Sequence, residues 1–252
     1  MSDLLSLRDV SKRFEQLRAV DGVTLDVPQG RIVGLIGPNG SGKSTLFNVI
    51  SGLERADAGT IQFDGHELAR RSAAEIFQLG LARSFQDPAL FFRMTVLDNT
   101  LLPEKGQRGE NPLRAPFRRT WSKQEAELAD AAGPVLDEVQ LRGHYAQLAS
   151  DLSGGQMKLL DIGRSLITNP KLLLLDEPTA GVAPKLARSI FEQIVHLRTS
   201  LNLTFLIIEH RLEILFDYVD SVYVMHNGRI IAYGAPAQVA ADAQVREIYF
   251  GE

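Results

Sequence analysis

Residues 37–45 read GPNGSGKST, and this glycine-rich loop constrains the fold more than any other stretch of the chain. A short apolar run at residues 31–36 predicts a buried strand before the loop. Residues 44–50 predict a helix after it, ending near Ser51 and Gly52. In such a unit a phosphate can sit at the helix N-terminus, where free N–H groups and the helix dipole favour anions. The sequence therefore predicts an anion site at this loop.

The letters of the loop fit the pattern G-x-x-x-x-G-K-[ST], in which each residue type has a chemical task. Glycines let backbone N–H groups converge on phosphate oxygens, the lysine supplies positive charge for the outer phosphates, and the next hydroxyl can ligate Mg²⁺. A turn without a ligand is the plain alternative, and the glycine spacing does not fit the G-x-G-x-x-G pattern of dinucleotide sites. We predict that ATP or GTP binds to Gly37, Pro38, Asn39, Gly40, Ser41, Gly42, Lys43, Ser44 and Thr45, with Ser44 as a metal ligand.

Composition limits the kinds of protein that can surround this loop. Of the 252 residues 44% are hydrophobic, which is enough for a substantial core in one domain or in a domain with a subdomain. A net charge of −4 argues against general attraction to nucleic acid or anionic lipid, and zero cysteines exclude disulfides and thiolate metal sites. The sequence shows neither a signal-like N-terminus nor an apolar run near the ~20 residues of a spanning helix, so we expect a soluble or peripheral protein.

The segments on either side of the loop predict short strands. Residues 6–14, 23–27 and 60–64 alternate apolar and polar side chains between turn signals, which is typical of a small antiparallel sheet. Phe14 and Val20 lie in this region and could belong to the core. An aromatic ring there could instead stack on a purine base, so we predict both residues as candidate nucleotide contacts.

The stretch that follows this sheet predicts a helix, a strand and two features with open roles. The helix covers residues 67–79, and the strand at 81–86 ends in Gln86, which could reach a metal or water or be an ordinary polar loop residue. Phe91 and Phe92 come next in a loop-like stretch. They would pack in the core or, if exposed, mark a protein docking site.

Residues 95–150 are mainly helical in pattern and carry no strand signal, which suggests an inserted helical subdomain. Basic residues between positions 105 and 119 are spread among proline and glycine, so a solvated segment is favoured over contact with lipid headgroups or a partner. Ser122 and Glu125 fit a capping box that opens a helix, and Pro134 predicts an interruption of that helix.

The sequence LSGGQ at residues 152–156 is a second strong signal. Ser153 and Gln156 have the spacing of a capping box at the start of a helix that runs to Leu166. The segment is either an ordinary capped helix or a second glycine-lined helix N-terminus suited to phosphate. Its residues alone leave that choice open.

An apolar run at residues 171–175 ends in two carboxylates, Asp176 and Glu177. Downstream of a phosphate loop this is the Walker B arrangement, in which Asp176 holds Mg²⁺ through water and Glu177 polarises the attacking water as general base. A general base commonly contributes roughly 10²–10⁴-fold to a rate. A further buried strand at 203–209 ends at His210, which could contact a γ-phosphate.

The C-terminal part predicts supporting elements. Residues 184–201 predict a helix with proline in its first turn, Asn227 and Gly228 predict a tight hairpin turn, and residues 236–250 predict one or two helices. The histidines other than His210 have no metal-ligand spacing, so we assign them no role.

These motifs occur in the order of the ATP-binding cassette (ABC) ATPases, and the chain resembles that family over essentially its whole length. The resemblance implies an α/β fold of the P-loop NTPase class, with a RecA-like, mostly parallel core sheet and an antiparallel β subdomain. The core and β subdomain would cover about 1–94 and 167–234. The inserted helical subdomain would cover about 95–166, and a C-terminal helical extension about 235–252.

The resemblance also implies ligands and site residues. Two cassettes pair head to tail in this family, so each ATP lies between the loop of one chain and the LSGGQ segment of the other. The predicted ligands are ATP and Mg²⁺. The implied residues are Glu177, His210 and Gln86 in catalysis, Ser153, Gly154, Gly155 and Gln156 on the partner's ATP, and Ser44, Gln86 and Asp176 around the metal.

Longer segments resemble the ATPases of branched-chain amino acid importers, and within these the longer of two paralogous cassettes. They are LARSFQDPALFFRMTVLDN at 81–99, the insertion at 99–125, EPTAGVAP at 177–184, IIEHRLEIL at 207–215 and VREIYFG at 245–251. Similar importers carry urea, amides and other amino acids, so the solute stays open. Ala183 replaces the family's Asp or Asn and removes an N-cap worth ~1 kcal/mol, and Arg211 replaces a common Asp.

The partners implied by the resemblance are transmembrane permease subunits, a second cassette (the same chain or a paralogue) and, indirectly, a periplasmic solute-binding protein. No nucleic-acid partner is expected, and the protein would sit at the cytoplasmic face of the inner membrane. The alternatives are a soluble ABC ATPase that acts on DNA or ribosomes, and a P-loop kinase or GTPase. The first would carry a long coiled coil or a fused second cassette, and the second is disfavoured by LSGGQ and by the lack of an N-K-x-D motif.

Overall fold

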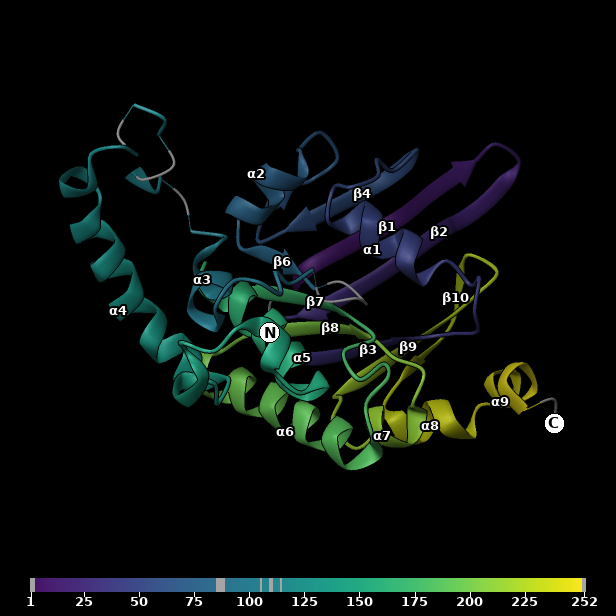
Figure 1. Cartoon of the computed structure of the whole chain (residues 1–252). Coiled ribbons are helices and arrows are strands. Elements are labelled where there is room, and N and C mark those ends of the chain that lie inside the picture. The colour runs from purple at the N-terminus through teal and green to yellow at the C-terminus, as the bar shows by residue number, and fades with distance from the viewer. Residues whose placement is uncertain (1–2, 85–88, 105, 109–110, 114, 251–252) are drawn as a thin grey trace.

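The computed structural model describes residues 3–84, 89–104, 106–108, 111–113 and 115–250 (Figure 1). The described strands form two sheets. The first sheet is antiparallel with the order β2-β1-β4-β5, and comprises β1 (Asp3–Phe14), β2 (Leu17–Pro28), β4 (Ala58–Phe63) and β5 (His66–Glu67). The second has the order β10-β9-β3-β8-β7-β6, and comprises β3 (Ile32–Ile36), β6 (Leu81–Arg83), β7 (Leu172–Asp176), β8 (Thr204–Ile208), β9 (Ser221–His226) and β10 (Arg229–Gly234).

The second sheet positions the predicted motifs. Its strands are parallel except for the edge strand β10, which forms an antiparallel hairpin with β9. Positive φ angles of 47° at Asn227 and 80° at Gly228 confirm the predicted turn between these two strands. The carboxyl ends of parallel strands meet at one edge of a sheet, so the ends of β3, β7 and β8 lie together. The glycine-rich loop, the two carboxylates and His210 leave the sheet at that edge.

Every residue of β3, β7 and β8 is buried, because both faces of the parallel sheet are covered. Alternate side chains enter different cores. Leu173 and Leu175 of β7 pack in the core under α6 (Pro184–Leu201), whereas Leu172 and Leu174 pack in the core shared with the antiparallel sheet and α1 (Lys43–Ile50). The sheet is therefore held in place from both sides.

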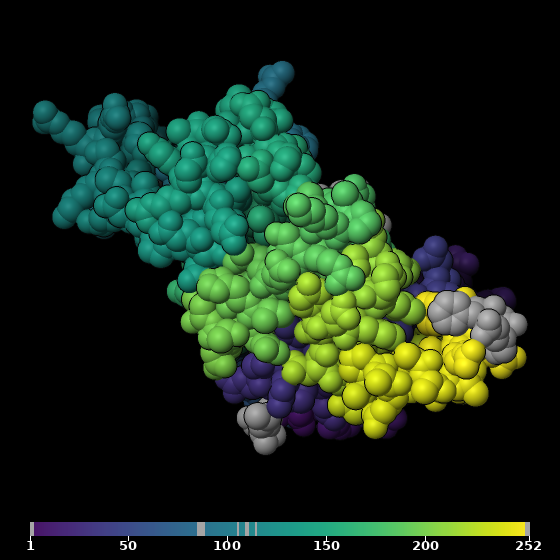
Figure 2. Space-filling view, turned by 90° about the horizontal axis from the view of Figure 1, so that it is seen from below, coloured from purple at the N-terminus to yellow at the C-terminus, as the bar shows by residue number. Residues whose placement is uncertain are grey.

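The region between β6 and β7 is helical and projects from the sheets. In Figure 1 α4 extends away from the body of the molecule. In Figure 2 this region (teal) forms a lobe next to the green part of the chain that contains α6, and the C-terminal helices (yellow) lie at the opposite end. The α-helices not yet named are α2 (Ala73–Gln78), α3 (Val96–Leu101), α4 (Ser122–Glu138), α5 (Gly154–Leu166), α7 (Leu212–Leu215), α8 (Pro236–Ala241) and α9 (Ala243–Phe250).

Two details of α4 correct the sequence prediction. Trp121 occupies the N-cap position and Ser122 is the first helical residue, so Ser122 does not open the helix as a capping box. The helix also continues through Pro134 instead of being interrupted there. Ala132 and Leu136 on either side of this proline are buried, and their packing offsets the ~3 kcal/mol that an interior proline costs.

The helix predicted at residues 67–79 was also too long. Glu67 belongs to β5, and α2 begins only at Ala73, after a capping box between Ser72 and Glu75. The capping box satisfies the free N–H groups of the first turn, which sets the start of the helix. Among the described residues, no helix combines the length and the apolar character needed to cross a bilayer.

Candidate nucleotide-binding site

A cavity of about 390 Å³ opens between the glycine-rich loop and the ends of β1 and β2. It brings together segments that are far apart in the sequence, among them the connection from β7 to α6 and the connection from β8 to α7. Its lining is Phe14, Leu17, Arg18, Ala19, Asn39, Gly40, Ser41, Gly42, Lys43, Ser44, Thr45, Glu177, His210, Asn227 and Gly228.

The glycines of the loop are required by its close packing. A Cβ atom on Gly37 would lie 2.1 Å from the carbonyl oxygen of Met225, and one on Gly42 would lie 2.1 Å from that of Ala19. Gly42 also has a φ of 104°, in the region that favours glycine. Gly228 N–H donates to Ser41 O at 3.0 Å, which fixes the loop to the β9–β10 turn. The loop is thus a rigid backbone cradle of the kind that binds phosphate.

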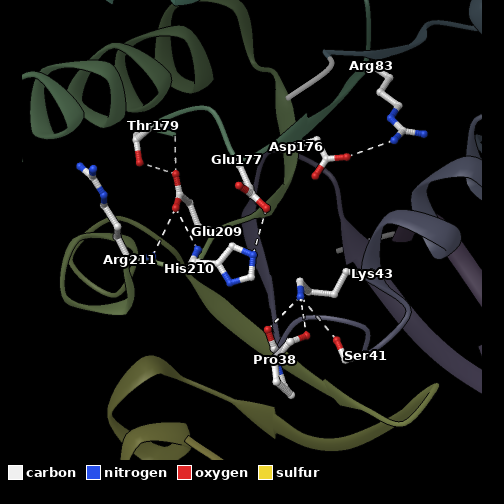
Figure 3. Close-up of polar contacts among 11 residues, drawn as sticks. Pro38, Ser41, Lys43, Arg83, Asp176, Glu177, Thr179, Glu209, His210 and Arg211 are labelled. Atoms are coloured by element: carbon white, nitrogen blue, oxygen red, sulfur yellow. Dashed lines mark hydrogen bonds and ion pairs between the residues drawn. The ribbon is translucent and has the colours of Figure 1, made fainter. Parts of the chain in front are cut away.

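Lys43 is the buried cation of the cavity, with 5% of its surface exposed. Its Nζ donates to Gly37 O at 2.8 Å and to Pro38 O at 3.0 Å (Figure 3). Burial lowers the pKa of Lys43, and the negative charges of Glu177 and Asp176 oppose that fall. The ammonium group is therefore costly to keep buried and is favoured by any further negative charge, such as a phosphate.

The two carboxylates after β7 take different positions. Asp176 is the last strand residue and is 7% exposed, whereas Glu177 turns into the cavity with a φ of 49°. Glu177 N–H donates to Ile208 O at 2.9 Å, so the left-handed turn is tied to the end of β8. His210 Nε2 lies 2.9 Å from Glu177 Oε1 (Figure 3). The predicted base and the predicted γ-phosphate contact therefore form one hydrogen-bonded pair.

Arg83 is a residue of this site that the sequence analysis missed. Its Nη2 donates to Asp176 Oδ2 at 3.1 Å, its Nη1 donates to Asn48 Oδ1 at 2.7 Å, and its side chain is 8% exposed. Burial lowers the pKa of Arg83, and Asp176 raises it. A charged residue at the end of β6, directly after the apolar Leu81 and Ala82, was the only sequence signal for this role.

Of the two residues predicted as candidate contacts of the nucleotide base, Phe14 and Val20, one lines the cavity and the other needs a correction. Phe14 lines the cavity and is 42% exposed, with Lys12 Nζ 5.2 Å from the centre of its ring. Val20 is fully buried in the core of the antiparallel sheet, because its position in β2 points its side chain inward. Its neighbours Leu17 and Ala19 line the cavity instead.

The LSGGQ segment forms the predicted capping box at the start of α5. Ser153 Oγ accepts from Gln156 N at 3.4 Å, and Gln156 Oε1 accepts from Ser153 N at 2.9 Å. Gln156 Nε2 also lies 3.0 Å from His144 Nε2, a contact that the sequence did not indicate. None of the residues 153–156 is among the described residues that line the cavity. The LSGGQ segment is thus separate from the cavity beside the glycine-rich loop.

Three other residues singled out in the sequence precede α3. Gln86 lies outside the described residues. Phe91 and Phe92 are 56% and 51% exposed, so they are not core residues. Asn99 holds this segment in place, because its Oδ1 accepts from Phe91 N at 2.9 Å and its Nδ2 donates to Phe91 O at 3.0 Å.

The oxygen groups of Ser44, which lines the cavity, and of Asp176, at the end of β7, fit Mg²⁺ together with a triphosphate. Ser44 presents a hydroxyl beside the loop and Asp176 a carboxylate at the strand end, and Mg²⁺ prefers such oxygen ligands with phosphate and water completing the shell. Within the ranges that the structure describes, no cluster of three or more His, Cys, Asp or Glu residues could hold a metal ion.

The sequence of this chain is similar to those of known ATP-binding cassette proteins. A family model described as "ABC transporter" matches residues 20–180, and a model described as "Branched-chain amino acid ATP-binding cassette transporter" matches residues 229–252. A probable branched-chain amino acid transport ATP-binding protein, LivG of Methanocaldococcus jannaschii, is 44% identical over 99% of this chain and 98% of the relative. The high-affinity branched-chain amino acid transport ATP-binding protein LivG of Escherichia coli K12 is 37% identical over 99% of this chain and 98% of the relative.

Solved structures give a similar result. The crystal structure of the ADP conformation of an ATP-binding cassette of an ABC transporter superposes with a TM-score of 0.88, at 44% identity and full coverage of both chains. A nucleotide-free ATP-binding cassette from an ABC transporter gives a TM-score of 0.87, also at 44% identity and full coverage of both chains.

Proposed function

This chain belongs to the ABC transporter family, and from that premise we propose that it is the ATP-hydrolysing subunit of a membrane importer for branched-chain or related amino acids. The family match and the structural neighbours confirm the predicted family and the predicted fold class. ATP binding and hydrolysis follow from that family. The solute is supported by the names of the relatives and by the C-terminal match. A soluble ABC ATPase that acts on DNA or ribosomes is not favoured by these comparisons.

One observation carries the proposal: Lys43, Glu177 and His210 line a single cavity with the glycine-rich loop. The loop N–H groups and Lys43 Nζ would bind the phosphates of ATP, and the γ-phosphate would then lie at the inner end of the cradle. Phe14, at the other side of the cavity, offers an exposed ring on which the base would stack.

The chemistry is the transfer of the γ-phosphoryl group to water. Glu177 would accept a proton from the attacking water, which makes the oxygen a better nucleophile. His210 would orient Glu177 through their 2.9 Å contact and would offer a donor to the γ-phosphate as charge develops on it. Hydrolysis would then leave ADP and inorganic phosphate in the cavity.

Ser44 and Asp176 would hold Mg²⁺, and Gln86, which lies outside the described residues, is the third metal contact in this proposal. When bound, the metal neutralises charge on the transferred phosphoryl group. Arg83 would fix the orientation of Asp176 by its hydrogen bond.

The cavity is half of a complete site in this proposal. Ser153, Gly154, Gly155 and Gln156 lie apart from their own chain's cavity, with the capping-box helix N-terminus of α5 suited to phosphate. A second cassette, either the same chain or a paralogue, would supply these residues across a head-to-tail interface. ATP would close this dimer and hydrolysis would reopen it.

Permease subunits would receive that motion at the cytoplasmic face of the membrane. A groove of about 250 Å³, with Leu53, Ala73, Phe77 and Pro103 in its lining, offers apolar contact between α1, α2 and α3. Phe91 and Phe92 expose further apolar surface in the segment before α3. A periplasmic solute-binding protein would act on the permeases and not on this chain. The division into core, helical subdomain (95–166) and C-terminal extension (235–252) is part of the same proposal.

The test is reconstitution of this chain in proteoliposomes with the permease subunits and second cassette encoded beside it. ATP-dependent uptake of leucine, isoleucine or valine is expected, and Glu177→Gln is expected to abolish it while ATP binding persists. ATP hydrolysis without uptake of any amino acid would reject the importer proposal. Absence of ATP hydrolysis from the wild-type chain would reject the enzymatic part.

A further inference from the structure

Glu209 is a buried carboxylate that the proposed chemistry does not use. It follows the last residue of β8 and is 2% exposed. Thr179 donates to its Oε1 twice, from its backbone N at 3.0 Å and from its hydroxyl. The backbone N–H groups of His210 and Arg211 donate to its Oε2, at 2.9 Å and 3.3 Å (Figure 3). Each carboxylate oxygen therefore accepts from a different segment of the chain.

Together with the chain itself, these contacts form a closed ring that includes the proposed catalytic residues Glu177 and His210. Thr179 lies two residues after Glu177, and Glu209 is bonded directly to His210. The remaining link is the 2.9 Å contact between His210 and Glu177. Moving His210 relative to Glu177 would thus also strain the contact between Glu209 and Thr179.

A carboxylate suits this place because every neighbouring group is a donor. An ionised carboxylate has acceptor sites for all of them and no donor of its own, whereas a Gln amide would present an NH₂ group to one pair of N–H donors. Hydrogen bonds to an ionised acceptor are also shorter and stronger than neutral ones. The four donors from the two segments therefore satisfy the acceptor sites of the buried Glu209 side chain.

Thr179 leads directly into the connection that ends at Ala183 and the start of α6. Val182 N–H donates to Thr179 O at 3.4 Å, so the connection folds back on Thr179. Movement of Thr179 would consequently be passed toward the N-terminus of α6.

We propose that Glu209 is a positioning residue that sets the geometry of the Glu177–His210 pair and couples displacement of His210 to the segment 179–183. This role rests on the proposed ATPase function. Glu209 itself touches neither water nor phosphate in this role, because it is buried behind His210. Its effect is on turnover and on the response to ATP, and it leaves binding of ATP by the loop intact.

The test uses three variants that break the contact: Glu209→Gln, Thr179→Val and the double variant that combines them. They are compared with Thr179→Ser, which keeps the hydroxyl donor. The buried carboxylate Asp161, paired with Arg164 at 2.7 Å in α5, supplies the control variant Asp161→Asn. For each protein kcat and KM for ATP, Kd for a fluorescent ATP analogue and Tm are measured. Glu177→Gln in the same assay serves as the reference for loss of the base.

Glu209→Gln and Thr179→Val are each expected to lower kcat at least tenfold, with Kd within threefold of the wild type. The double variant is expected to be no slower than the slower single variant, because both substitutions break the same link. Thr179→Ser should retain at least half of kcat, and Asp161→Asn should change Tm without a tenfold loss of kcat.

Three outcomes would overturn the role. One is normal kcat in Glu209→Gln and Thr179→Val, and the second is multiplication of their effects in the double variant. The third is a fall of kcat that is proportional to the fall of Tm in every variant, including the control Asp161→Asn. If Glu209→Gln does not fold, kcat of Thr179→Val decides alone, and Thr179→Ser is then expected to restore kcat. Failure of the wild-type chain to hydrolyse ATP would count against the proposed function, and all other results bear on Glu209 alone.

Discussion

The guanidinium of Arg83 lies 3.1 Å from the carboxylate of Asp176, and 8% and 9% of the two side chains are exposed. The pair joins the ends of β6 and β7, and a second bond from Arg83 to Asn48 joins both strands to α1. A buried ion pair of this kind is a poor source of net stability, but removal of one partner leaves a buried charge uncompensated.

Arg83→Met is therefore expected to destabilise the fold by about 3–5 kcal/mol, the usual consequence of breaking a buried pair on one side. Urea denaturation of the purified chain measures the free energy of unfolding. Arg31→Met is the matched control, because Arg31 forms a more exposed ion pair with Asp220 and should cost much less. Equal losses in the two variants would show that the burial of Arg83 is without consequence.

Glu177→Gln should preserve ATP binding and slow hydrolysis by roughly 10²–10⁴-fold, because the amide cannot accept a proton from water. Single-turnover hydrolysis gives the rate, and size-exclusion chromatography with ATP reports a trapped dimer. Hydrolysis at the wild-type rate would remove Glu177 from the role of base.

Lys43→Met should abolish tight ATP binding while leaving Tm unchanged or higher, because a buried ammonium that is costly to desolvate is lost. The sign of the pH effect follows from the lowered pKa of Lys43. At a pH just below 10.5, the ordinary pKa of a lysine, Lys43 is still protonated in the unfolded chain but is already losing its proton in the folded chain. The stability of the wild type relative to Lys43→Met should therefore rise as the pH approaches 10.5. A relative stability that falls over that range, in urea melts at several pH values, would contradict the assignment.

Changing Phe91 and Phe92 to Ala should leave the ATPase rate of the isolated chain and its Tm unaffected, because both side chains are about half exposed. Coupling to the permeases is expected to fall, measured as solute transported per ATP hydrolysed in proteoliposomes. Leu201→Ala, an exposed apolar change at the end of α6, is the control and should not reduce coupling. A drop in Tm for the phenylalanine variant would mean that the pair supports the fold.

Ala183→Asn should stabilise the protein by ~1 kcal/mol, because Ala183 is the N-cap of α6 in an extended conformation and has no acceptor in its side chain. Its φ of −64° and ψ of 152° suit an Asn that accepts from the first helical turn. Thermal unfolding measures the gain. A lower Tm would indicate that the space around Ala183 does not admit the larger side chain.

Short-range sequence patterns were sufficient to predict the strands and helices that bear the site residues. The strand at 32–36, the loop after it and the helix from Lys43 follow from apolar runs, glycine spacing and short-range hydrogen bonds. The helix of residues 184–201 was predicted with its observed ends, because Pro184 marks its first turn. The motifs to which we propose to assign catalysis were equally visible, since each occupies a few consecutive residues next to a buried strand.

Predictions failed where the deciding neighbour lies elsewhere in the chain. The continuation of α4 through Pro134 depends on burial of the helix on both sides of the proline. Val20 was predicted as a candidate nucleotide contact, with core packing as the alternative, because sequence position does not tell which face of β2 meets the core.

By itself the sequence determined the phosphate loop, the carboxylates after the apolar strand and the cap of α5. These depend on chemistry within a few residues. Only the tertiary structure decided that Arg83 pairs with Asp176, that His210 meets Glu177, and that Glu209 holds Thr179. The reason is physical: buried charges and hydrogen-bonding groups need partners, and the sheet order supplies them from strands that are distant in sequence.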